Sequence, residues 1–315
     1  MNNHPISKIF NIYKPAGISS ADVVYHFKKN LERPFGKIGH FGTLDPFAEG
    51  VLLIGVGGAC RLSDYAHEYL PKTYLATGLL GQKMSTGDID GDVIEEKSCD
   101  HLIGLENSNE KMNQACQSFL GEYLQSPPAF SATKHKGKAL YKWAREGVTI
   151  SKPAVKRFIH SIEFVEKKAN ELTVRVAASS GTYIRTLFED LANELDTVGH
   201  LVKLKRESIG HISSDNSLLR DKWPLKEKNQ EILEYLQMPQ LLPFKHLQLD
   251  KEVDKKYSNG ISISINDVTI PNDDDYDLWQ APYLWVYGEH NKLIGLGVIK
   301  DNQVKACFNL PQNHS

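Results

Sequence analysis

The sequence predicts an α+β fold: a mixed, mainly antiparallel sheet with flanking helices, followed by a small C-terminal β module. Strand and helix patterns follow one another without the regular β-α-β rhythm of a doubly wound sheet. The 315 residues also exceed what one hydrophobic core usually serves, which favours two domains. The prolines Pro239 and Pro243 interrupt the patterns, so we place the domains at 1–243 and 244–315.

The N-terminal elements follow from short local signals. Lys8–Tyr13 has the composition of a strand, and the turn-forming Pro15–Gly17 ends it. Ser19 and Asp22 have the spacing of a capping box, and the apolar residues after them recur on one helical face, so a helix follows. The glycines and prolines of Gly36–Gly50 predict a structured loop instead of a regular element.

The middle of the chain predicts three strands and two helices. Val51–Val56 is continuously apolar, as in a strand buried on both faces, and Lys72–Leu80 is a second strand before a polar loop at Gly81–Gly91. A short amphipathic helix is expected at Lys138–Glu146, and Glu171–Val176 alternates like a half-buried strand.

The second helix has one apolar stripe, with Ser180 or Thr182 as its expected cap. The stripe consists of Ile184, Leu187, Phe188, Leu191 and Leu195.

The C-terminal region shows short strand patterns separated by turn signals. The strands are expected at Ile261–Ile265, Tyr283–Tyr287 and Leu293–Ile299, with turns at Asn259-Gly260 and Gly288-Glu289. This pattern is typical of a small β-barrel.

Composition excludes several classes of protein. Hydrophobic residues make up 41% and charged residues 24%, as in a globular chain and unlike a disordered or collagen-like one. No apolar run reaches the roughly 18 residues of a membrane span, and the first residues lack the pattern of a secretory signal. The four cysteines lie far apart without a C-x-x-C pair, so we expect free thiols in a reducing cytoplasm.

The net charge of −2 conceals an uneven distribution. Acids outnumber bases after Asp250, with an acidic run at 273–277. The segment from Phe130 to Arg157 contains one acid, Glu146, and many bases. These bases are Lys134, Lys136, Lys138, Lys142, Arg145, Lys152, Lys156 and Arg157. A basic face beside an acidic flank suits an oriented polyanion, although a solvated lysine-rich loop has the same composition.

The densest group of chemically interesting residues is the loop Gly39–Gly50, where Asp45 precedes Pro46. A residue before proline is biased toward extended backbone, which directs the carboxylate away from a helical path. An Asp-Pro in a glycine-rich loop is also a common plain turn. The buried strand directly downstream favours a rigidly anchored loop.

Two further clusters place polar groups at the ends of elements. Tyr74 lies inside a predicted strand, and a polar loop opens at 85–88. Tyr183 and Arg185 lie at a strand-to-helix junction among apolar residues. Such an arginine is often a structural ion pair, but a pairing of Arg185 with Asp45 would keep that carboxylate ionised at neutral pH.

These motifs together resemble one family, the TruB-type tRNA pseudouridine synthases. The resemblance covers residues 8–210 and is carried by five segments in the family's order, with a sixth near the start. The segments are Gly39–Gly50, Lys72–Tyr74, Ser126–Lys134, Ser180–Leu187 and Leu204–Arg206, preceded by Lys14–Ser20. The C-terminal region is similar to the PUA-like module of the bacterial enzymes. The fold implied is a bent pseudouridine synthase sheet followed by a PUA-like β-barrel.

The resemblance implies an isomerase that converts the uridine at position 55 of the TΨC arm of tRNA to pseudouridine. The base leaves the sugar at N1, turns, and is rejoined through C5, with neither metal nor organic cofactor. The implied partner is the T-arm stem-loop of tRNA, and the implied protein is a cytoplasmic monomer without a membrane partner.

The resemblance also implies a role for individual residues. Asp45 matches the essential aspartate, Tyr74 the tyrosine that stacks on the target uracil, and Arg185 the arginine that pairs with the carboxylate. The base must leave its stack, which costs a few kcal/mol. The implied substrate-binding residues are His40, Tyr183, Leu204, Lys14, Lys134 and Arg206.

Some positions depart from the family pattern, among them Phe41, Leu53, Lys205 and the segment Gly58–Arg61. None of them removes a side chain implied in chemistry.

Two other functions are compatible with the residues. The first is an RNA-binding module that helps tRNA to fold and whose site is vestigial. The second is a glycoside hydrolase that uses Asp45 with a second carboxylate, for which Glu49 is the nearest candidate. Product formation on a T-arm substrate separates the first from an isomerase, and release of free uracil would identify the second.

Overall fold

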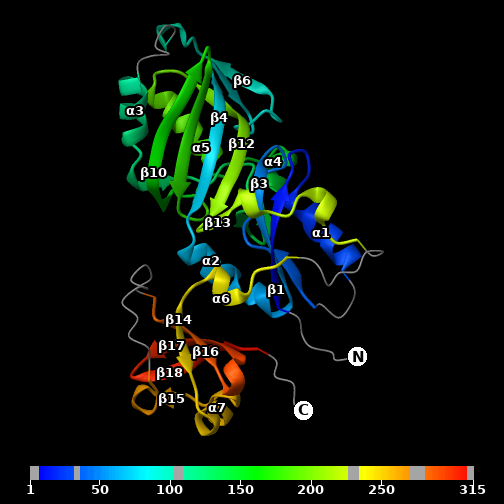
Figure 1. The fold of residues 1–315 in the computed structure, drawn as a ribbon. Helices are drawn as coiled ribbons and strands as arrows, with labels where there is room; N and C mark the ends of the chain where they lie inside the picture. The colour runs from blue at the N-terminus through cyan, green and yellow to red at the C-terminus, as the bar shows by residue number, and fades with distance from the viewer. Residues whose placement is uncertain (1–6, 32–35, 103–108, 226–233, 270–280, 311–315) are drawn as a thin grey trace.

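The computed structural model describes residues 7–31, 36–102, 109–225, 234–269 and 281–310 (Figure 1). A nine-stranded sheet forms the larger part of the molecule, and a separate five-stranded sheet follows it in sequence. Figure 1 shows the smaller sheet below the larger one, with helices α2 and α6 between them. The predicted α+β class is confirmed.

The main sheet has the order β1-β3-β12-β4-β11-β10-β7, with β2 added to β3 and β13 added to β12. All of its pairings are antiparallel except the short one between β12 and β3, which confirms the mainly antiparallel prediction. Its strands are β1 (Lys8–Lys14), β2 (Ile38–His40), β3 (Glu49–Val56), β4 (Lys72–Leu80), β7 (Gly121–Gln125), β10 (Val155–Lys168), β11 (Glu171–Ala178), β12 (Gly199–Ile209) and β13 (Ile212–Ser213).

Helices flank the sheets, and two hairpins project from the main sheet. The helices are α1 (Ser20–Asn30), α2 (Ser63–Tyr69), α3 (Asn109–Gln117), α4 (Leu140–Arg145), α5 (Ile184–Glu194), α6 (Met238–Leu241) and α7 (Lys251–Ser258). The hairpins pair β5 (Gln82–Met84) with β6 (Val93–Glu96), and β8 (Lys134–His135) with β9 (Lys138–Ala139).

Helix α1 begins at the predicted capping box. The Ser19 hydroxyl accepts a hydrogen bond from the Asp22 N–H, and the Asp22 carboxylate accepts one from the Ser19 N–H. Val23 and Phe27 are fully buried, and the Phe27 ring lies 5.4 Å from that of Phe10 on β1. Each such side chain contributes about 1.5–3 kcal/mol through burial, so the apolar face holds α1 against the sheet.

Helix α5 packs on the face of the sheet formed by alternate residues of β4. Leu187 and Phe188 share one buried cluster with Tyr74 and Ala76 of that strand. The chain passes under the Phe188 ring at Gly78, where an added Cβ would lie 2.1 Å from the ring. Because of this packing, the N-terminus of α5 lies on the same face as Tyr74.

The predicted cap of α5 is wrong. The N-cap residue is Tyr183, and its side chain makes no capping hydrogen bond to the helix. The Thr182 hydroxyl instead donates to the Ser179 carbonyl at 2.8 Å, inside the preceding turn, and Ser180 Oγ is buried without a partner. The hydroxyls are therefore occupied or directed elsewhere, and the helix start is held by another part of the chain.

Two predicted loops contain short strands. β2 lies within Gly36–Gly50 and pairs with β3, and β5 lies within Gly81–Gly91 and pairs with β6. Both strands are three residues long, too short for a period-two pattern to be recognised.

The C-terminal sheet confirms two predicted strands and shortens the third. Its strands are β14 (Lys245–Gln248), β15 (Ile263–Ser264), β16 (Tyr283–Tyr287), β17 (Leu293–Lys300) and β18 (Gln303–Asn309), in the order β14-β16-β17-β18-β15. The five strands form an open path, as in the half-barrel of a PUA-like module. The predicted turn at Asn259-Gly260 is present and directly follows helix α7, a helix that was not predicted.

The two sheets share a buried cluster. Ile9 and Leu53 of the main sheet pack with Trp285 and Leu296 of the C-terminal sheet. The indole N–H of Trp285 donates to the carbonyl of Leu242 at 2.6 Å, just before the second sheet begins. The division into 1–243 and 244–315 stays a prediction, and the acidic run at 273–277 lies outside the described residues.

Two predictions from composition concern the cysteines and membrane-spanning helices. All four cysteines are free, as expected. Within the described parts of the chain, no helix is both long and apolar enough to cross a bilayer.

The parallel contact between β3 and β12 predicts that Gly50→Ala is destabilising. Gly50 has a φ of +108°, and an added Cβ would lie 2.2 Å from the Arg206 carbonyl oxygen. Strain of this kind costs about 1–3 kcal/mol, and the contact with the main chain adds to it. We expect a loss of more than about 2 kcal/mol in urea unfolding.

A matched control for this substitution is Gly121→Ala. Gly121 also has a positive φ, +91°, but an added Cβ would meet nothing within 4 Å. Equal losses for the two variants would contradict a role for the close approach to Arg206.

Candidate active site

The loop that carries Asp45 is docked on the start of helix α1. The Ser20 hydroxyl accepts from the Leu44 N–H at 2.8 Å and donates to the Leu44 carbonyl at 3.0 Å. The Gly17 N–H donates to the Pro46 carbonyl at 2.8 Å. Backbone groups on both sides of Asp45 therefore have fixed partners, so the carboxylate projects from an anchored loop.

Two buried cations hold the same loop, which corrects the prediction that Lys14 and Arg206 bind substrate. Both side chains are fully buried, at 0% exposure, so neither can contact a ligand from solution. Lys14 Nζ donates to the carbonyls of Pro15 at 2.9 Å and Ile18 at 2.7 Å, and lies 3.3 Å from that of Pro46. Burial lowers the pKa of Lys14 to about 8.

Arg206 satisfies carbonyls at both ends of the loop. Its Nε donates to Val51 at 2.7 Å, and its terminal nitrogens donate to Gly42 at 3.1 Å and Thr43 at 3.3 Å. Lys14 and Arg206 therefore both bind backbone carbonyls of the Asp45 loop and the chain next to it.

Arg185 forms an ion pair with Asp45, the pairing that the resemblance implied. Arg185 Nε lies 2.9 Å from Asp45 Oδ2, and one terminal nitrogen lies 3.4 Å from Oδ1. The Arg185 side chain is only 5% exposed, whereas that of Asp45 is 34% exposed. The carboxylate is therefore gripped on its buried side and open to solvent on the other.

Asp88 is a residue of the site that sequence reasoning missed. Its Oδ2 lies 3.5 Å from Arg185, on a side chain that is almost as buried as the guanidinium. Its other oxygen accepts from the Thr86 hydroxyl at 2.6 Å and the Asp90 N–H at 3.1 Å. The polar loop at 85–88 was noted in the sequence, but nothing local to it indicated a contact with Arg185.

Burial and two neighbouring charges act on the pKa of Asp45. Burial raises the pKa of this carboxyl above its ordinary value, while the positive charge of Arg185 lowers it and the negative charge of Asp88 raises it again. Arg185 thus opposes burial without overcoming it. A closer approach of the guanidinium lowers the pKa of Asp45, and a more distant one lets it rise.

Apolar side chains line the surroundings of Asp45. Tyr74 on β4 and Leu204 on β12 are largely buried and belong to the same cluster as Leu44 and Phe47 of the loop. Tyr183 is half-buried at the start of α5, and its hydroxyl lies 2.9 Å from Thr133 Oγ1. The structure thus brings the expected aromatic residues to the region of the carboxylate.

His40 ends strand β2, a few residues before Asp45. Its ring is half-buried, and Nδ1 is buried without a hydrogen-bond partner. Burial lowers the pKa of His40, so the neutral ring is favoured at neutral pH.

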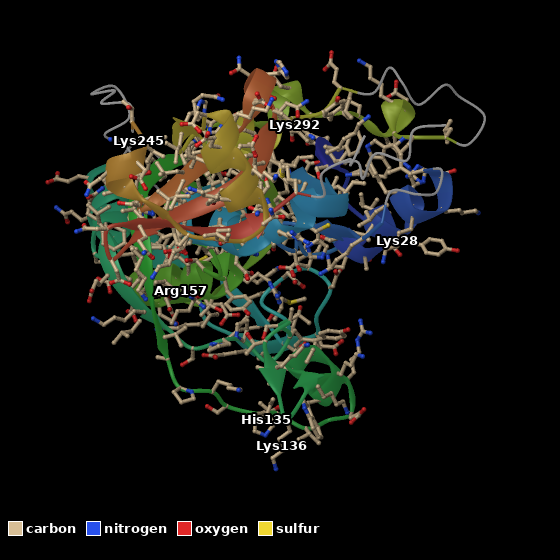
Figure 2. The ribbon with its side chains drawn as sticks, turned by 90° about the horizontal axis from the view of Figure 1, so that it is seen from below. Lys28, His135, Lys136, Arg157, Lys245 and Lys292 are labelled. Carbon is tan, nitrogen blue, oxygen red and sulfur yellow. The ribbon has the colours of Figure 1, made fainter. Side chains whose placement is uncertain are left out.

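Lys134 is exposed on strand β8, at the beginning of the basic segment. Figure 2 shows His135 and Lys136 at the tip of a projection that extends away from the two sheets. Lys138 forms an ion pair with Glu146 and lies 4.1 Å from the centre of the Trp143 ring. Lys134 and Lys136 next to it are exposed.

The carboxylate proposed for a glycoside hydrolase has another partner. Glu49 forms a side-chain hydrogen bond with Tyr13 and contributes, after burial, to raising the pKa of that tyrosine to about 12. Within the described residues, no group of three or more histidine, cysteine or carboxylate side chains is arranged to hold a metal ion.

Comparison with known proteins identifies the class. Residues 28–184 match the family model for TruB family pseudouridylate synthase, N terminal domain. A tRNA pseudouridine synthase B of Clostridium kluyveri is 37% identical over 300 residues, covering 94% of this chain and 97% of the relative. One from Thermosipho melanesiensis is 37% identical over 251 residues, covering 79% of this chain and 78% of the relative. The chain therefore belongs to the TruB family of pseudouridylate synthases.

Solved structures show the same fold at lower sequence identity. A chain in the crystal structure of a Cbf5-Nop10-Gar1 complex superposes with a TM-score of 0.66 at 22% identity, covering 96% of this chain and 85% of that one. A chain of an H/ACA RNP bound to a substrate RNA containing 2'-deoxyuridine gives 0.65 at 20% identity, covering 97% and 85%. The likeness extends over both sheets.

The contact between Arg185 and Asp45 predicts the direction of a titration. Arg185→Ala removes the positive charge that opposes burial, so the pKa of Asp45 rises further. The measurement is a carbon-13 NMR titration of the Asp45 carboxyl.

Arg175→Ala serves as the control, because Arg175 pairs on the surface with Glu207 at 2.9 Å and belongs to no part of this site. An Asp45 titration that is the same in Arg185→Ala and wild type would contradict the electrostatic role of Arg185.

Proposed function

We propose that this protein is a tRNA pseudouridine synthase, an isomerase that converts uridine 55 in the T-arm of tRNA to pseudouridine. The TruB-family relatives that cover 79% and 94% of this chain are named tRNA pseudouridine synthase B. The observation that carries the proposal is the Asp45 carboxylate, which is open to solvent on one side and bound by the buried Arg185 on the other.

The reaction rearranges one nucleoside without loss of atoms. The bond from C1′ of the ribose to N1 of uracil breaks, a bond from C1′ to C5 forms, and the proton at C5 leaves while N1 gains one. We assign to Asp45 the essential contact with the target nucleoside, because it presents a carboxylate to solvent from an anchored loop. Arg185 favours the ionised form of Asp45 that this role requires.

Tyr74 and Leu204 are proposed to hold the uracil between an aromatic and an aliphatic surface. Stacking of a base on an aromatic ring contributes about 1–3 kcal/mol, which offsets part of the cost of extruding the base. Tyr183 supports this pocket, and its hydroxyl contact with Thr133 at 2.9 Å keeps the ring in place. His40 is proposed to occupy the gap that the extruded base leaves in the RNA.

The basic segment is proposed to bind the phosphates of the T-arm. Structured RNA is recognised mostly through its shape and backbone, which lysines on a projecting hairpin can contact. Lys134 and Lys136 are both exposed there. We propose a monomer as the active form, since Asp45 and Arg185 meet within one chain without a second copy. The free cysteines support a reducing compartment such as the cytoplasm.

Asp45→Asn tests the proposed chemistry. The amide keeps the shape of the side chain and removes its charge, so we expect no pseudouridine in an unmodified tRNA transcript. Binding of tRNA should stay within about tenfold, or ~1.4 kcal/mol. Chemical labelling of pseudouridine locates the product, and a filter-binding assay measures the affinity.

Asp196→Asn is a matched control, because the Asp196 side chain is exposed and pairs with Lys97 at 2.6 Å, away from the site. Product from Asp45→Asn would contradict the assignment. Salt-sensitive binding by a wild-type protein that forms no product would instead indicate an RNA-binding module.

The basic segment generates a separate prediction about salt. Replacing Lys134 and Lys136 together by alanine should weaken binding by about tenfold at moderate salt. Each lost phosphate contact should reduce the slope of log affinity against log salt by about 0.7–0.9.

Lys97→Ala, which removes a lysine already paired with Asp196, is the control for this change. A salt slope that is unaltered in the double variant would show that the hairpin does not touch phosphates.

A further inference from the structure

A buried glutamine holds the backbone at the start of helix α5. Gln125, the last residue of β7, is 1% exposed. Its Oε1 accepts from the Tyr183 N–H at 2.8 Å, and its Nε2 donates to the Tyr183 carbonyl at 2.9 Å. One side-chain amide thus binds both the N–H and the carbonyl of Tyr183, the N-cap residue of the helix.

This clamp acts on an N-cap residue whose own side chain does not cap α5. Tyr183 is the N-cap residue, and it offers no side-chain hydrogen bond to the helix. The first N–H groups of a helix lack partners within the helix, so an uncapped end is free to fray unless something else holds it. Gln125 holds this end from the neighbouring edge strand of the sheet.

The position of Arg185 depends on where the helix begins, because it lies two residues after Tyr183. Its guanidinium donates to the Thr86 carbonyl at 2.6 Å and contacts Asp45 at 2.9 Å. A shift of the first turn by about one ångström would lengthen both contacts beyond hydrogen-bond distance. The position of the Tyr183 backbone therefore determines how closely the Arg185 guanidinium approaches Asp45.

The chain after Gln125 touches the same turn twice more. The Phe130 carbonyl accepts from Arg185 at 2.8 Å, and Thr133 Oγ1 lies 2.9 Å from the Tyr183 hydroxyl. On the other side, the Tyr123 hydroxyl donates to Asp190 further along α5, and Gln125 Nε2 lies 3.4 Å from that hydroxyl. The other contacts of this set reach side chains of α5 or of Tyr183. Gln125 binds the backbone of Tyr183, so it is the contact that fixes where the helix begins.

We propose that Gln125 is a positioning residue that aims Arg185 at Asp45 by fixing the backbone of Tyr183. It does not touch substrate. The inference rests on the proposed function, since it assigns Gln125 to the isomerase site. It requires a loss of turnover without loss of RNA affinity when the clamp is removed.

Gln125→Met is the test, because methionine keeps the length of the side chain and makes neither hydrogen bond. Under saturating tRNA we expect pseudouridine formation to slow at least tenfold, with the Kd for tRNA within twofold of wild type. The acidic limb of the pH–rate profile should move to higher pH, in the same direction as for Arg185→Ala. A wild-type rate together with an unmoved limb would overturn the proposal.

Thr197→Val is the matched control at the opposite end of α5. The Thr197 hydroxyl is buried and donates to the Lys97 carbonyl at 3.0 Å. Its loss should lower the melting temperature without changing the rate or the acidic limb. If Thr197→Val moves the limb as far as Gln125→Met does, the effect is general loosening of the helix, and the proposal fails.

Gln125→Glu covers the case in which the methionine variant does not fold. A glutamate keeps an acceptor for the Tyr183 N–H and, when ionised, loses the donor to the Tyr183 carbonyl. We expect a smaller rate loss and a limb that still moves upward. A limb identical to that of wild type would overturn the proposal.

A measurement without turnover separates this inference from the proposed function. The Asp45 carboxyl is titrated by NMR in wild type and in the Gln125 variants. A wild-type protein that forms no pseudouridine would refute the proposed function, and an upward shift of the Asp45 titration would still support the positioning role. An Asp45 titration unchanged in a folded Gln125 variant would refute that role alone.

Discussion

The contact between the guanidinium of Arg185 and the carboxylate of Asp45 is the interaction on which the rest of the site depends. Burial disfavours a charged carboxylate, and here it raises the pKa of Asp45 even with the arginine beside it. The guanidinium is itself almost wholly buried, so it needs partners in turn, and it finds them in Thr86, Asp88 and Phe130. Three segments distant in sequence are thereby gathered around one cation.

The loop beneath Asp45 illustrates how buried charge can serve geometry. Moving an ammonium or guanidinium out of water costs several kcal/mol, so a buried cation is tolerated only where it has strong acceptors. Lys14 and Arg206 find them in backbone carbonyls of the loop and its neighbours, which leaves few alternative positions for the chain there. The Asp45 carboxylate, which this loop carries, is therefore held in a defined position.

The sequence was sufficient for features that depend on local chemistry. The capping box at Ser19 and the strand Lys72–Leu80 are present as predicted, and Arg185 lies against Asp45 as the resemblance implied. Features that depend on distant contacts were missed or assigned wrongly. Nothing in the sequence around Asp88 points to Arg185, because the two meet only after the sheet forms.

The same reasoning explains the misassigned residues. Lys14 and Arg206 are cations in matched motifs, a pattern shared by residues that bind a polyanion and residues that hold a loop. Only burial tells the two apart. A cap of α5 was expected from the hydroxyls next to the helix, whereas the backbone of its N-cap residue is held by Gln125, from a strand about sixty residues earlier in the chain.

The apolar cluster shared by the two sheets has a consequence for how the chain denatures. Trp285 and Leu296 are buried against Ile9 and Leu53, so unfolding of either sheet would expose the apolar surface of the other to water. Although a boundary between the modules can be drawn in the sequence, each therefore lends stability to its neighbour. The chain should lose its native structure in a single cooperative transition, which leaves no thermal window in which the larger sheet stands alone.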